Sequence, residues 1–389
     1  TKSVICENNI SLYKGGITVD GYFNSITNNT ITNLKEIALA IDVTGDSNNV
    51  DHNIITNLEG DGISSIYGSF NNVYNNKITD TQGGISVYGS FNNVINNTIQ
   101  SVVVGISGAY FIANETIYIF GIFGDYVSGN EIRDCTAGVV VSNETSMVSN
   151  FLRNCTKGTV IIGNFSTVTS NTFLSCLYGA HIRKGTNGNA IYDNMFLNST
   201  AADDSKTGAN SWDAGSETGG NYWCDYERED FNLDSFGDTP RNIYNVYSNE
   251  TNNKDNYPLI VPRRPIPVFW KDTKYDCLIA GNVTVCRFGS DENKTISFKT
   301  VGYGCVNLTI PRDYLDGSFC ISVNDAQTPW LSSWTKTHTS IYFECKTSGS
   351  NIVKIEAQMK FAGDINGDGQ VNLSDIFIVA KNFGNKLYP

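Results

Sequence analysis

Two nearly identical stretches of twelve residues limit what this chain can fold into. YGSFNNVYNNKI at Tyr67–Ile78 returns as YGSFNNVINNTI at Tyr88–Ile99, 21 positions later. A repeat this short is one supersecondary unit, which buries its apolar face only by stacking on copies of itself. We therefore expect Tyr67 and Phe70 to stack on their counterparts in the next copy. The unit continues along the chain as Asn-x-(Ile/Leu/Phe) anchors, which lie at Asn8, Asn29, Asn53, Asn76, Asn97, Asn130, Asn150, Asn171 and Asn194.

The spacing of these anchors predicts the fold class. The intervals are 20 to 24 residues, with one of 33, and a glycine follows most anchors by eight or nine positions. About three short β-branched strands per repeat predict an all-β chain that forms a right-handed parallel β-helix of about nine coils. A β-sandwich would need hairpin signals instead of a fixed period. The anchor asparagines are expected to form amide ladders between coils ~4.8 Å apart, since Asn tolerates left-handed turns and bonds neighbouring backbone.

Composition excludes several partners. The 389 residues carry a formal net charge of −12. An acidic surface argues against nucleic acid and against an anionic membrane surface. No apolar run reaches the ~18 residues that suggest a membrane span. The chain starts at Thr1 directly in repeat sequence, which we interpret as a processed chain.

The ten cysteines favour an exported protein. Three of them lie five residues after consecutive anchors and should stack, which is compatible with one disulfide or with a buried stack of thiols. Five more crowd the region after residue 270, where we expect one or two bridges. The disulfide candidates are Cys135, Cys155, Cys176, Cys277, Cys286, Cys305, Cys320 and Cys345.

Asn-x-Ser/Thr sequons occur along the whole chain and support export and glycosylation. Asn114 is the strongest single candidate, because it lies in the 33-residue interval, where an inserted coil should project. The glycosylation candidates are Asn28, Asn96, Asn114, Asn143, Asn198, Asn249, Asn282 and Asn293.

The repeat period stops near Asn198, and an aromatic and acidic segment follows. Its phrases GGNYW, GDTP and DNYPL resemble the closing segment of NosD-type, carbohydrate-binding-like β-helix proteins found on archaeal surfaces. The resemblance extends over roughly residues 8–262 and implies a cap over the last coil, with Tyr222 and Trp223 covering the core. A β-helix end is an unpaired sheet edge, so some cap is needed.

An acidic loop inside this cap is a candidate calcium site. Oxygen-bearing side chains two residues apart suit Ca²⁺, which accepts six to eight oxygen ligands. A solvated acidic loop is the alternative. The candidate ligands are Asp230, Asn232, Asp234 and Asp238.

The remaining chain begins with a Pro-rich linker at Val261–Val268 and continues with alternating apolar and polar residues, which predict an Ig-like β-sandwich. These segments resemble a small module near the C-termini of archaeal secreted proteins, which implies surface display. We divide the chain into a β-helix (1–200), its cap (201–262), the sandwich (263–361) and a C-terminal repeat (362–389).

The stretch DINGDGQVNLSD in that C-terminal repeat has the ligand spacing of an EF-hand, with Gly369 at the sharp turn. With the following IFIVAKNFG it resembles one dockerin repeat. A dockerin usually pairs two, so either the second is missing or the apolar face binds another surface. The expected calcium ligands are Asp364, Asn366, Asp368, Gln370, Asn372 and Asp375.

An active site is weakly indicated. Glycoside hydrolysis needs converging carboxylates, whereas the acids on the coils are scattered and Asp203 and Asp204 lie beyond the last regular coil. The basic candidates are Arg133, Arg153 and His181, for which a structural role is the alternative. Fold analogy by itself supplies no function.

We therefore expect an exported, glycosylated, calcium-binding surface protein with a structural or adhesive role. Its partners would be copies of itself, through the coil edge, or a partner of the dockerin-like tail, with glycan binding on the surface. The alternative is a polysaccharide lyase or glycoside hydrolase tethered through that tail.

Overall fold

The computed structural model describes residues 2–11, 14–35, 39–107, 109–113, 116–120, 124–228, 230–246, 251–315, 319–347 and 349–357. These residues form two compact units, which are described separately. The first comprises Thr1–Trp223 and Thr239–Leu259, and the second comprises Cys224–Asp238 and Ile260–Pro389. Every regular element in the described residues is a strand, and no helix there is long and apolar enough to cross a membrane.

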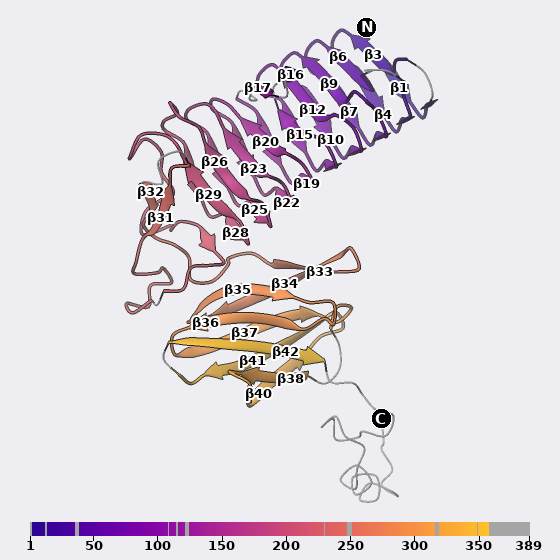
Figure 1. The fold of residues 1–389 in the computed structure, drawn as a ribbon. Helices are drawn as coiled ribbons and strands as arrows, with labels where there is room; N and C mark the ends of the chain where they lie inside the picture. The colour runs from indigo at the N-terminus through magenta and orange to yellow at the C-terminus, as the bar shows by residue number, and fades with distance from the viewer. Residues whose placement is uncertain are drawn as a thin grey trace, which may run out of the picture. The chain divides into compact units, whose positions relative to one another are not determined.

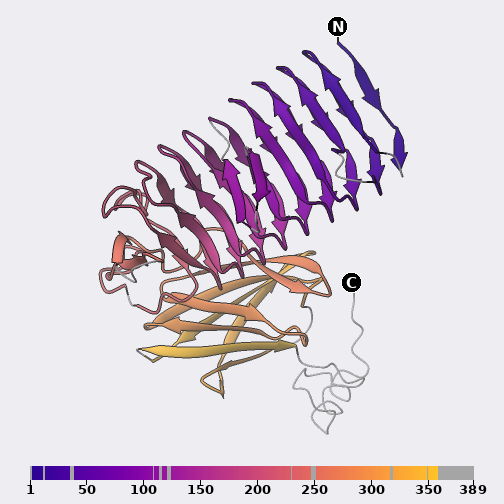
Figure 2. The same ribbon diagram turned by 45° about the horizontal axis from the view of Figure 1, so that its top comes forward.

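The first unit is a right-handed parallel β-helix, as the repeat predicts (Figure 1). Consecutive coils each add one strand to three long sheets, and Figure 2 shows the strands stacked coil upon coil. Sheet A holds β1 (Val4–Cys6), β4 (Ser25–Thr27), β7 (Asn49–Asp51), β10 (Asn72–Tyr74), β13 (Asn93–Ile95), β18 (Tyr126–Ser128), β21 (Ser146–Val148), β24 (Thr167–Thr169) and β27 (Ala190–Tyr192).

The other two sheets extend the same stack. Sheet B holds β2 (Asn9–Ser11), β5 (Thr30–Thr32), β8 (Ile54–Thr56), β11 (Lys77–Thr79), β14 (Thr98–Gln100), β19 (Glu131–Arg133), β22 (Phe151–Arg153), β25 (Thr172–Leu174), β28 (Met195–Leu197) and β30 (Tyr222–Trp223). Sheet C holds β3 (Ile17–Asp20), β6 (Ile41–Thr44), β9 (Asp61–Tyr67), β12 (Gly83–Tyr88), β15 (Val104–Ser107), β20 (Ala137–Val141), β23 (Lys157–Ile161), β26 (Tyr178–Ile182), β29 (Thr200–Asp203), β31 (Arg241–Tyr244) and β32 (Thr251–Asp255). The 33-residue interval contains an antiparallel hairpin of β16 (Ala109–Ala113) and β17 (Thr116–Phe120).

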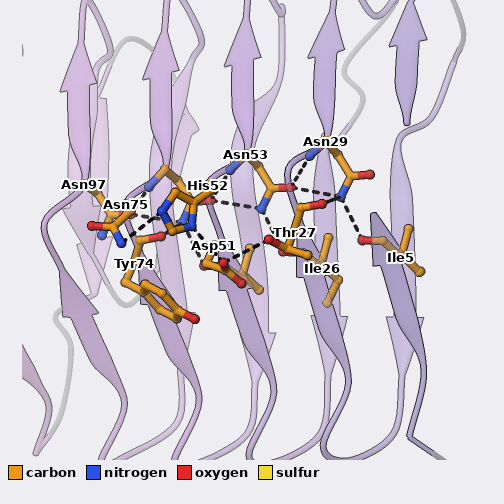
Figure 3. A network of polar contacts seen from close by, with 12 residues as sticks. Ile5, Ile26, Thr27, Asn29, Asp51, His52, Asn53, Tyr74, Asn75 and Asn97 are labelled. Carbon is orange, nitrogen blue, oxygen red and sulfur yellow. Dashed lines mark hydrogen bonds and ion pairs between the residues drawn. The ribbon is translucent and has the colours of Figure 1, made fainter. Parts of the chain in front are cut away.

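The anchor asparagines form the predicted amide ladder between sheets A and B (Figure 3). Asn53 Nδ2 donates to the Asn76 side-chain oxygen at 3.0 Å and to the Ile26 carbonyl at 2.9 Å. The same Asn76 oxygen also accepts the Asn53 backbone N–H at 3.0 Å. The residue in the left-handed conformation is the one before the ladder asparagine, for example Asn28 or Asn75. We expected one asparagine both to adopt the left-handed conformation and to bond the neighbouring coil. Instead, one residue adopts that conformation and the asparagine after it forms the hydrogen bonds.

A second ladder, which the anchor pattern did not predict, lies at the turn from sheet C to sheet A. Asn71 donates its backbone N–H and its side-chain amide to Asn92 Oδ1, at 2.9 and 3.1 Å. Asn92 in turn donates its N–H to Asp125 Oδ1 at 2.7 Å. Both asparagines are fully buried. Each coil is therefore fixed to the next by polar contacts at two of its corners.

Glycine recurs in sheet C because the coils approach closely there. A Cβ built on Gly138 would lie 2.5 Å from Leu152 Cδ2 and 2.6 Å from the Gly158 carbonyl oxygen. The same close approach occurs at Gly84, Gly105, Gly158 and Gly179.

Replacing Gly138 with alanine is expected to lower the free energy of unfolding by about 2 kcal/mol, because the neighbouring coil must shift to admit the methyl group. Gly15 is the control, since a Cβ there meets nothing within 4 Å. Gly15→Ala should change stability by less than about 1 kcal/mol. Urea denaturation measures both variants, and equal effects would contradict the close-packing account.

The C-terminal end of the β-helix is closed by aromatic rings, and the coils continue beyond Asn198. Phe196 stacks on Trp223 with ring centroids 4.1 Å apart, and Trp212 packs beside Trp223 at 6.2 Å. Trp223 belongs to β30, which adds a further strand to sheet B. The predicted covering role of Tyr222 and Trp223 agrees with their burial, at 0% and 1% exposure.

The second unit contains two antiparallel five-stranded sheets. Phe298 of one packs against Phe343 of the other, with centroids 6.3 Å apart. One sheet holds β33 (Ile266–Trp270), β34 (Thr273–Gly281), β37 (Gly304–Pro311), β41 (His338–Cys345) and β40 (Trp330–Trp334). The other holds β35 (Thr284–Ser290), β36 (Ile296–Val301), β42 (Ser350–Ala357), β38 (Phe319–Val323) and β39 (Ala326–Gln327).

Candidate functional site

A column of exposed phenylalanines, here called the aromatic ridge, runs along the turns between sheets C and A. The ridge consists of Phe23, Phe70, Phe91 and Phe165, which are 58–65% exposed. Backbone hydrogen bonds place them at the same position of their coils: Phe23, Phe70 and Phe165 each donate the N–H to the residue before the counterpart in the next coil, and Phe91 is the counterpart of Phe70. Ser47, Gly124 and Glu144 occupy the same column where a phenylalanine is absent. Large apolar rings therefore face solvent in register.

The ridge residues have a costly backbone conformation. Their φ values are +57° to +60°, in the left-handed region that bulky side chains rarely adopt. Strain of this kind persists only where the surroundings impose it. Here the residue after each phenylalanine belongs to the second ladder, for example Asn71 after Phe70 and Asn92 after Phe91. A strained position filled with an exposed apolar ring contributes little to folding, which suggests a functional reason for the ring.

The predicted stacking of aromatic residues between coils is confirmed. The rings of Phe70 and Phe91 lie 5.5 Å apart with an interplanar angle of 13°. Tyr67 and Tyr88 stack at 4.5 Å and 22° on the strands that lead into the same turns. The sequence repeat predicted these contacts but not the exposure of the rings, which are 49–59% exposed at Tyr67, Phe70 and Phe91. The Gly-x-Phe-Asn sequence of these turns is the signal that could have predicted the exposure of the phenylalanine ring.

A row of outward-facing amides, here called the amide row, flanks the ridge on sheet A. Asn72 Nδ2 donates to Asn49 Oδ1 at 2.9 Å, and Asn93 Nδ2 donates to Asn72 Oδ1 at 2.8 Å. All three are half-buried and lie opposite one another in the sheet register. Each amide carries both donors and acceptors, as a sugar hydroxyl does. The ridge thus offers flat apolar faces with hydrogen-bonding groups two residues away.

An aspartate–histidine pair lies at the far edge of the same sheet (Figure 3). Asp51 Oδ2 lies 2.9 Å from His52 Nδ1 and accepts the Thr27 hydroxyl at 2.9 Å. Burial, together with the Asp51 charge, raises the pKa of the neighbouring Tyr74. The sequence analysis missed this pair, because Asp51 and His52 directly precede a ladder asparagine and do not recur in the other coils. It extends the polar surface of sheet A beyond the amide row.

The basic residues proposed for catalysis do not converge. Arg133 and Arg153 are register partners on β19 and β22 of sheet B, whereas His181 lies on β26 of sheet C. His181 Nε2 lies 2.7 Å from Asp204 Oδ2, and their side chains are 3% and 1% exposed. Burial lowers the pKa of His181. This contact joins two neighbouring coils, and a catalytic role for Arg133, Arg153 or His181 stays a prediction.

The placement of Asp203 and Asp204 corrects one expectation. Asp203 belongs to the regular strand β29 and pairs with Ile182, so the acids do not lie beyond the last coil. Asp203 accepts hydrogen bonds from Trp212 Nε1 at 2.9 Å and from Asn253 Nδ2 at 2.7 Å. The carboxylates of Asp203 and Asp204 therefore both form contacts that stabilise the end of the β-helix.

The acidic loop proposed for calcium uses its oxygens on its own backbone. Asp230 accepts the N–H groups of Asp234 and Ser235 at 3.2 and 2.8 Å, and Asp238 accepts that of Phe231 at 2.6 Å. Asn232 Oδ1 also accepts the Asp234 N–H, at 3.0 Å. Across the described part of the chain, no group of three or more His, Cys, Asp or Glu side chains is placed to hold a metal ion. Calcium binding at this loop stays a prediction.

The C-terminal calcium loop, with Asp364, Asn366, Asp368, Gln370, Asn372 and Asp375, lies outside the described residues, as do Asn114 and Asn249. Five other sequon asparagines are exposed and Asn143 is half-buried. The exposed ones are Asn28, Asn96, Asn198, Asn282 and Asn293.

The structure holds the described cysteines as free thiols. Cys135, Cys155 and Cys176 lie on consecutive coils and are 2–5% exposed. Hydrogen bonding to Cys155 and burial raise the pKa of both Cys135 and Cys176. Among the candidates of the second unit, Cys277, Cys286 and Cys345 are buried, whereas Cys305 and Cys320 are half-buried. The predicted bridges stay predictions.

Comparison with known proteins supports the β-helix assignment. Residues 120–228 match the family model described as periplasmic copper-binding protein (NosD), which is less than half of the chain. No curated protein matches the chain. The description of the family names copper; in the described part of the chain, no group of three or more His, Cys, Asp or Glu side chains could hold a metal ion.

Several solved structures are similar at low identity. They include the Dettilon tailspike protein gp208, with 12% identity and a TM-score of 0.28 over 91% of this chain and 86% of that chain. The tailspike gp49 of Acinetobacter baumannii bacteriophage Fri1, a capsular polysaccharide depolymerase, has 12% identity and a TM-score of 0.28 over 88% and 70%. The tailspike of Escherichia coli bacteriophage HK620, solved with a pentasaccharide, has 10% identity and a TM-score of 0.29 over 90% and 69%. Similarity at this level says nothing about what this chain binds.

Proposed function

We propose that this protein is an exported adhesive shaft that binds a neutral glycan along the aromatic ridge and the amide row. The single observation that carries the proposal is the ridge itself, where four rings are exposed on strained backbone and two of them, Phe70 and Phe91, stack on each other. Exposed apolar patches of this kind mark binding surfaces. Aromatic faces suit the C–H faces of sugar rings, and the neighbouring amides suit their hydroxyls.

Charge favours a neutral ligand over an acidic one. The chain carries a formal net charge of −12, which repels polyanions over the range of the screening length. The ridge column itself contains Glu144, which is exposed. Sulfated or uronate-rich polymers are therefore poor candidates, and unsubstituted polysaccharides are better ones.

Replacing Phe70 and Phe91 together with asparagine is expected to weaken glycan binding about tenfold or more, because two stacking faces are lost. Asparagine tolerates the left-handed backbone, so the fold should be retained. Phe231→Asn is the matched control, since Phe231 is 79% exposed but lies in the other unit. Affinity electrophoresis and pull-down on cellulose, chitin, xylan, mannan and polygalacturonate measure the binding.

The competing occupant of the ridge is a second copy of the chain, as expected for a self-assembling filament or sheath. Sedimentation velocity of the intact protein, which measures self-association, distinguishes a second copy of the chain from a glycan as the occupant of the ridge. If the chain self-associates, loses that association in the Phe70→Asn/Phe91→Asn variant and binds none of the polysaccharides, the ridge is an interface between copies and the glycan proposal fails.

A further inference from the structure

A pocket lies at the end of the aromatic ridge, within the β-helix unit. Its volume is about 560 Å³, which is within the range of small-molecule sites. Its walls come from the turn at residues 188–190, the segment 207–213 and residues 253, 254 and 256 on and just after β32. The segment 207–213 stacks on residues 188–191 as part of the next coil, and β32 turns back along β31 as its antiparallel partner.

The pocket continues the ridge column. Phe165 donates its N–H to the Asn187 carbonyl at 3.2 Å, which places Gly188 as its counterpart in the next coil. A Cβ on Gly188 would lie 2.6 Å from Phe165 Cδ1, so only glycine leaves room for the ring. Gly188 also lines the pocket. The last ring of the ridge thus lies directly beside the pocket.

Hydrogen bonds among buried asparagine side chains fix the wall of the pocket. Asn189 Nδ2 donates to Asn210 Oδ1 at 2.9 Å, which continues the second ladder. Asn253 accepts the Gly208 N–H at 2.7 Å and donates to Asp203 Oδ2 at 2.7 Å. All of these asparagines are 7% exposed or less. A ligand would therefore enter a preformed site and lose little affinity to ordering.

Other lining groups have hydrogen-bonding capacity left. Asn256 donates its side-chain amide to Asp213 Oδ2 at 2.9 Å, while its Oδ1 accepts no hydrogen bond from the described residues. Lys254 is exposed and forms no ion pair with any described residue. Lys254 and Asp213 are the only charged side chains of the described lining, so the pocket carries no net charge. That balance suits hydroxyls better than a phosphate or a carboxylate.

We propose that this pocket binds the terminal sugar unit of a neutral glycan whose following units lie along the ridge. The proposal rests on the proposed function and adds an end-binding subsite to it. Recognition of one chain end would fix the direction in which the glycan lies on the shaft. The hydrogen bonds to the terminal sugar come from Asn256, Ser211, Lys254 and Asp213. The ring of Phe165 would lie next to the second sugar of the glycan.

Saturation-transfer NMR on the intact chain tests the pocket. The probes are methyl glycosides of glucose, galactose, mannose and N-acetylglucosamine, with glucuronate and inorganic phosphate as charged comparisons. At least one neutral glycoside should receive saturation from the intact chain. Ala209→Trp should abolish that signal by filling the pocket, and Asn256→Ala should reduce it at least about threefold. Phe231→Asn should retain it, because Phe231 lies in the other unit.

The outcomes separate the pocket from the ridge. Loss of polysaccharide binding in the ridge variant, with no monosaccharide signal from the intact chain, would overturn the pocket and leave the ridge. A neutral-sugar signal that persists in both Ala209→Trp and Asn256→Ala would place that sugar elsewhere and overturn the pocket. Binding of phosphate or glucuronate in preference to every neutral glycoside would contradict the neutral-sugar assignment. Melting temperatures verify that the variants fold.

Discussion

Asn130→Ala is expected to lower the free energy of unfolding of the β-helix on the order of 4 kcal/mol. The Asn130 side chain is fully buried and serves three coils. Its Oδ1 accepts the backbone N–H and the side-chain amide of Asn97, at 2.8 and 3.0 Å. Its Nδ2 donates to the Val94 carbonyl at 2.8 Å and to Asn150 Oδ1 at 2.9 Å. Alanine would leave the Asn97 backbone N–H buried without its partner, at a cost of about 1–3 kcal/mol, and would remove one hydrogen bond each from Asn97 Nδ2, the Val94 carbonyl and Asn150 Oδ1.

Asn242→Ala is the control for the ladder. Asn242 is exposed on β31, and its side chain has no hydrogen bond to the described residues, so its loss should change stability by less than about 0.5 kcal/mol. Guanidinium denaturation followed by circular dichroism compares the two variants with the parent chain. Equal stability of the Asn130→Ala variant and the parent would show that the ladder is not what joins the coils.

Stability of the β-helix unit is expected to fall as pH rises from about 4 to about 7, because of Asp255. This carboxyl is 0% exposed, and burial raises its pKa from 3.8 to about 7 although Asn221 and Trp223 donate hydrogen bonds to it. Between these values the folded chain retains a proton that the unfolded chain has lost. The stabilisation is therefore complete below about pH 4 and is lost as pH rises through about 7, a change on the order of 4 kcal/mol.

Asp255→Asn isolates this effect from that of other acids. Asparagine retains one oxygen for the Trp223 N–H but cannot ionise, so the pH dependence of the variant should be flatter than that of the parent over the same range. Denaturation at several pH values between 4 and 8 gives both curves. Parallel curves would show that Asp255 does not titrate in this range in the folded chain.

The sequence predicted those parts of the fold that depend on one coil contacting the next. The anchor asparagines had to stack because the repeat is short, and Phe70 over Phe91 follows from the same period. The second ladder was missed, because its residues change from Asn71 and Asn92 to Asp125 and then to Ser166 along the chain. Because the residue type at this position of the coil changes along the chain, the position is not recognised as a repeat in the sequence.

The candidate site was only partly predictable, for a physical reason. Exposure of Phe70 depends on a left-handed backbone, which a pattern of apolar residues does not reveal and which usually excludes phenylalanine. The contact between His181 and Asp204 requires the coil register to continue through β29, whereas the loss of the anchor pattern near Asn198 suggested that it ends. The pocket depends on residues 207–213, which continue the stack after the anchor pattern ends, and on β32, which pairs antiparallel with β31, and the repeat marks neither segment.

Hydroxyl-radical footprinting of the intact chain, with and without the polysaccharide it retains best, tests the central claim most directly. The account predicts that oxidation of Phe70 and Phe91 falls several-fold when the glycan is bound, while oxidation of the exposed Phe231 does not change. Protection confined to residues away from the ridge, or unchanged oxidation of Phe70 and Phe91 at saturating glycan, would contradict it.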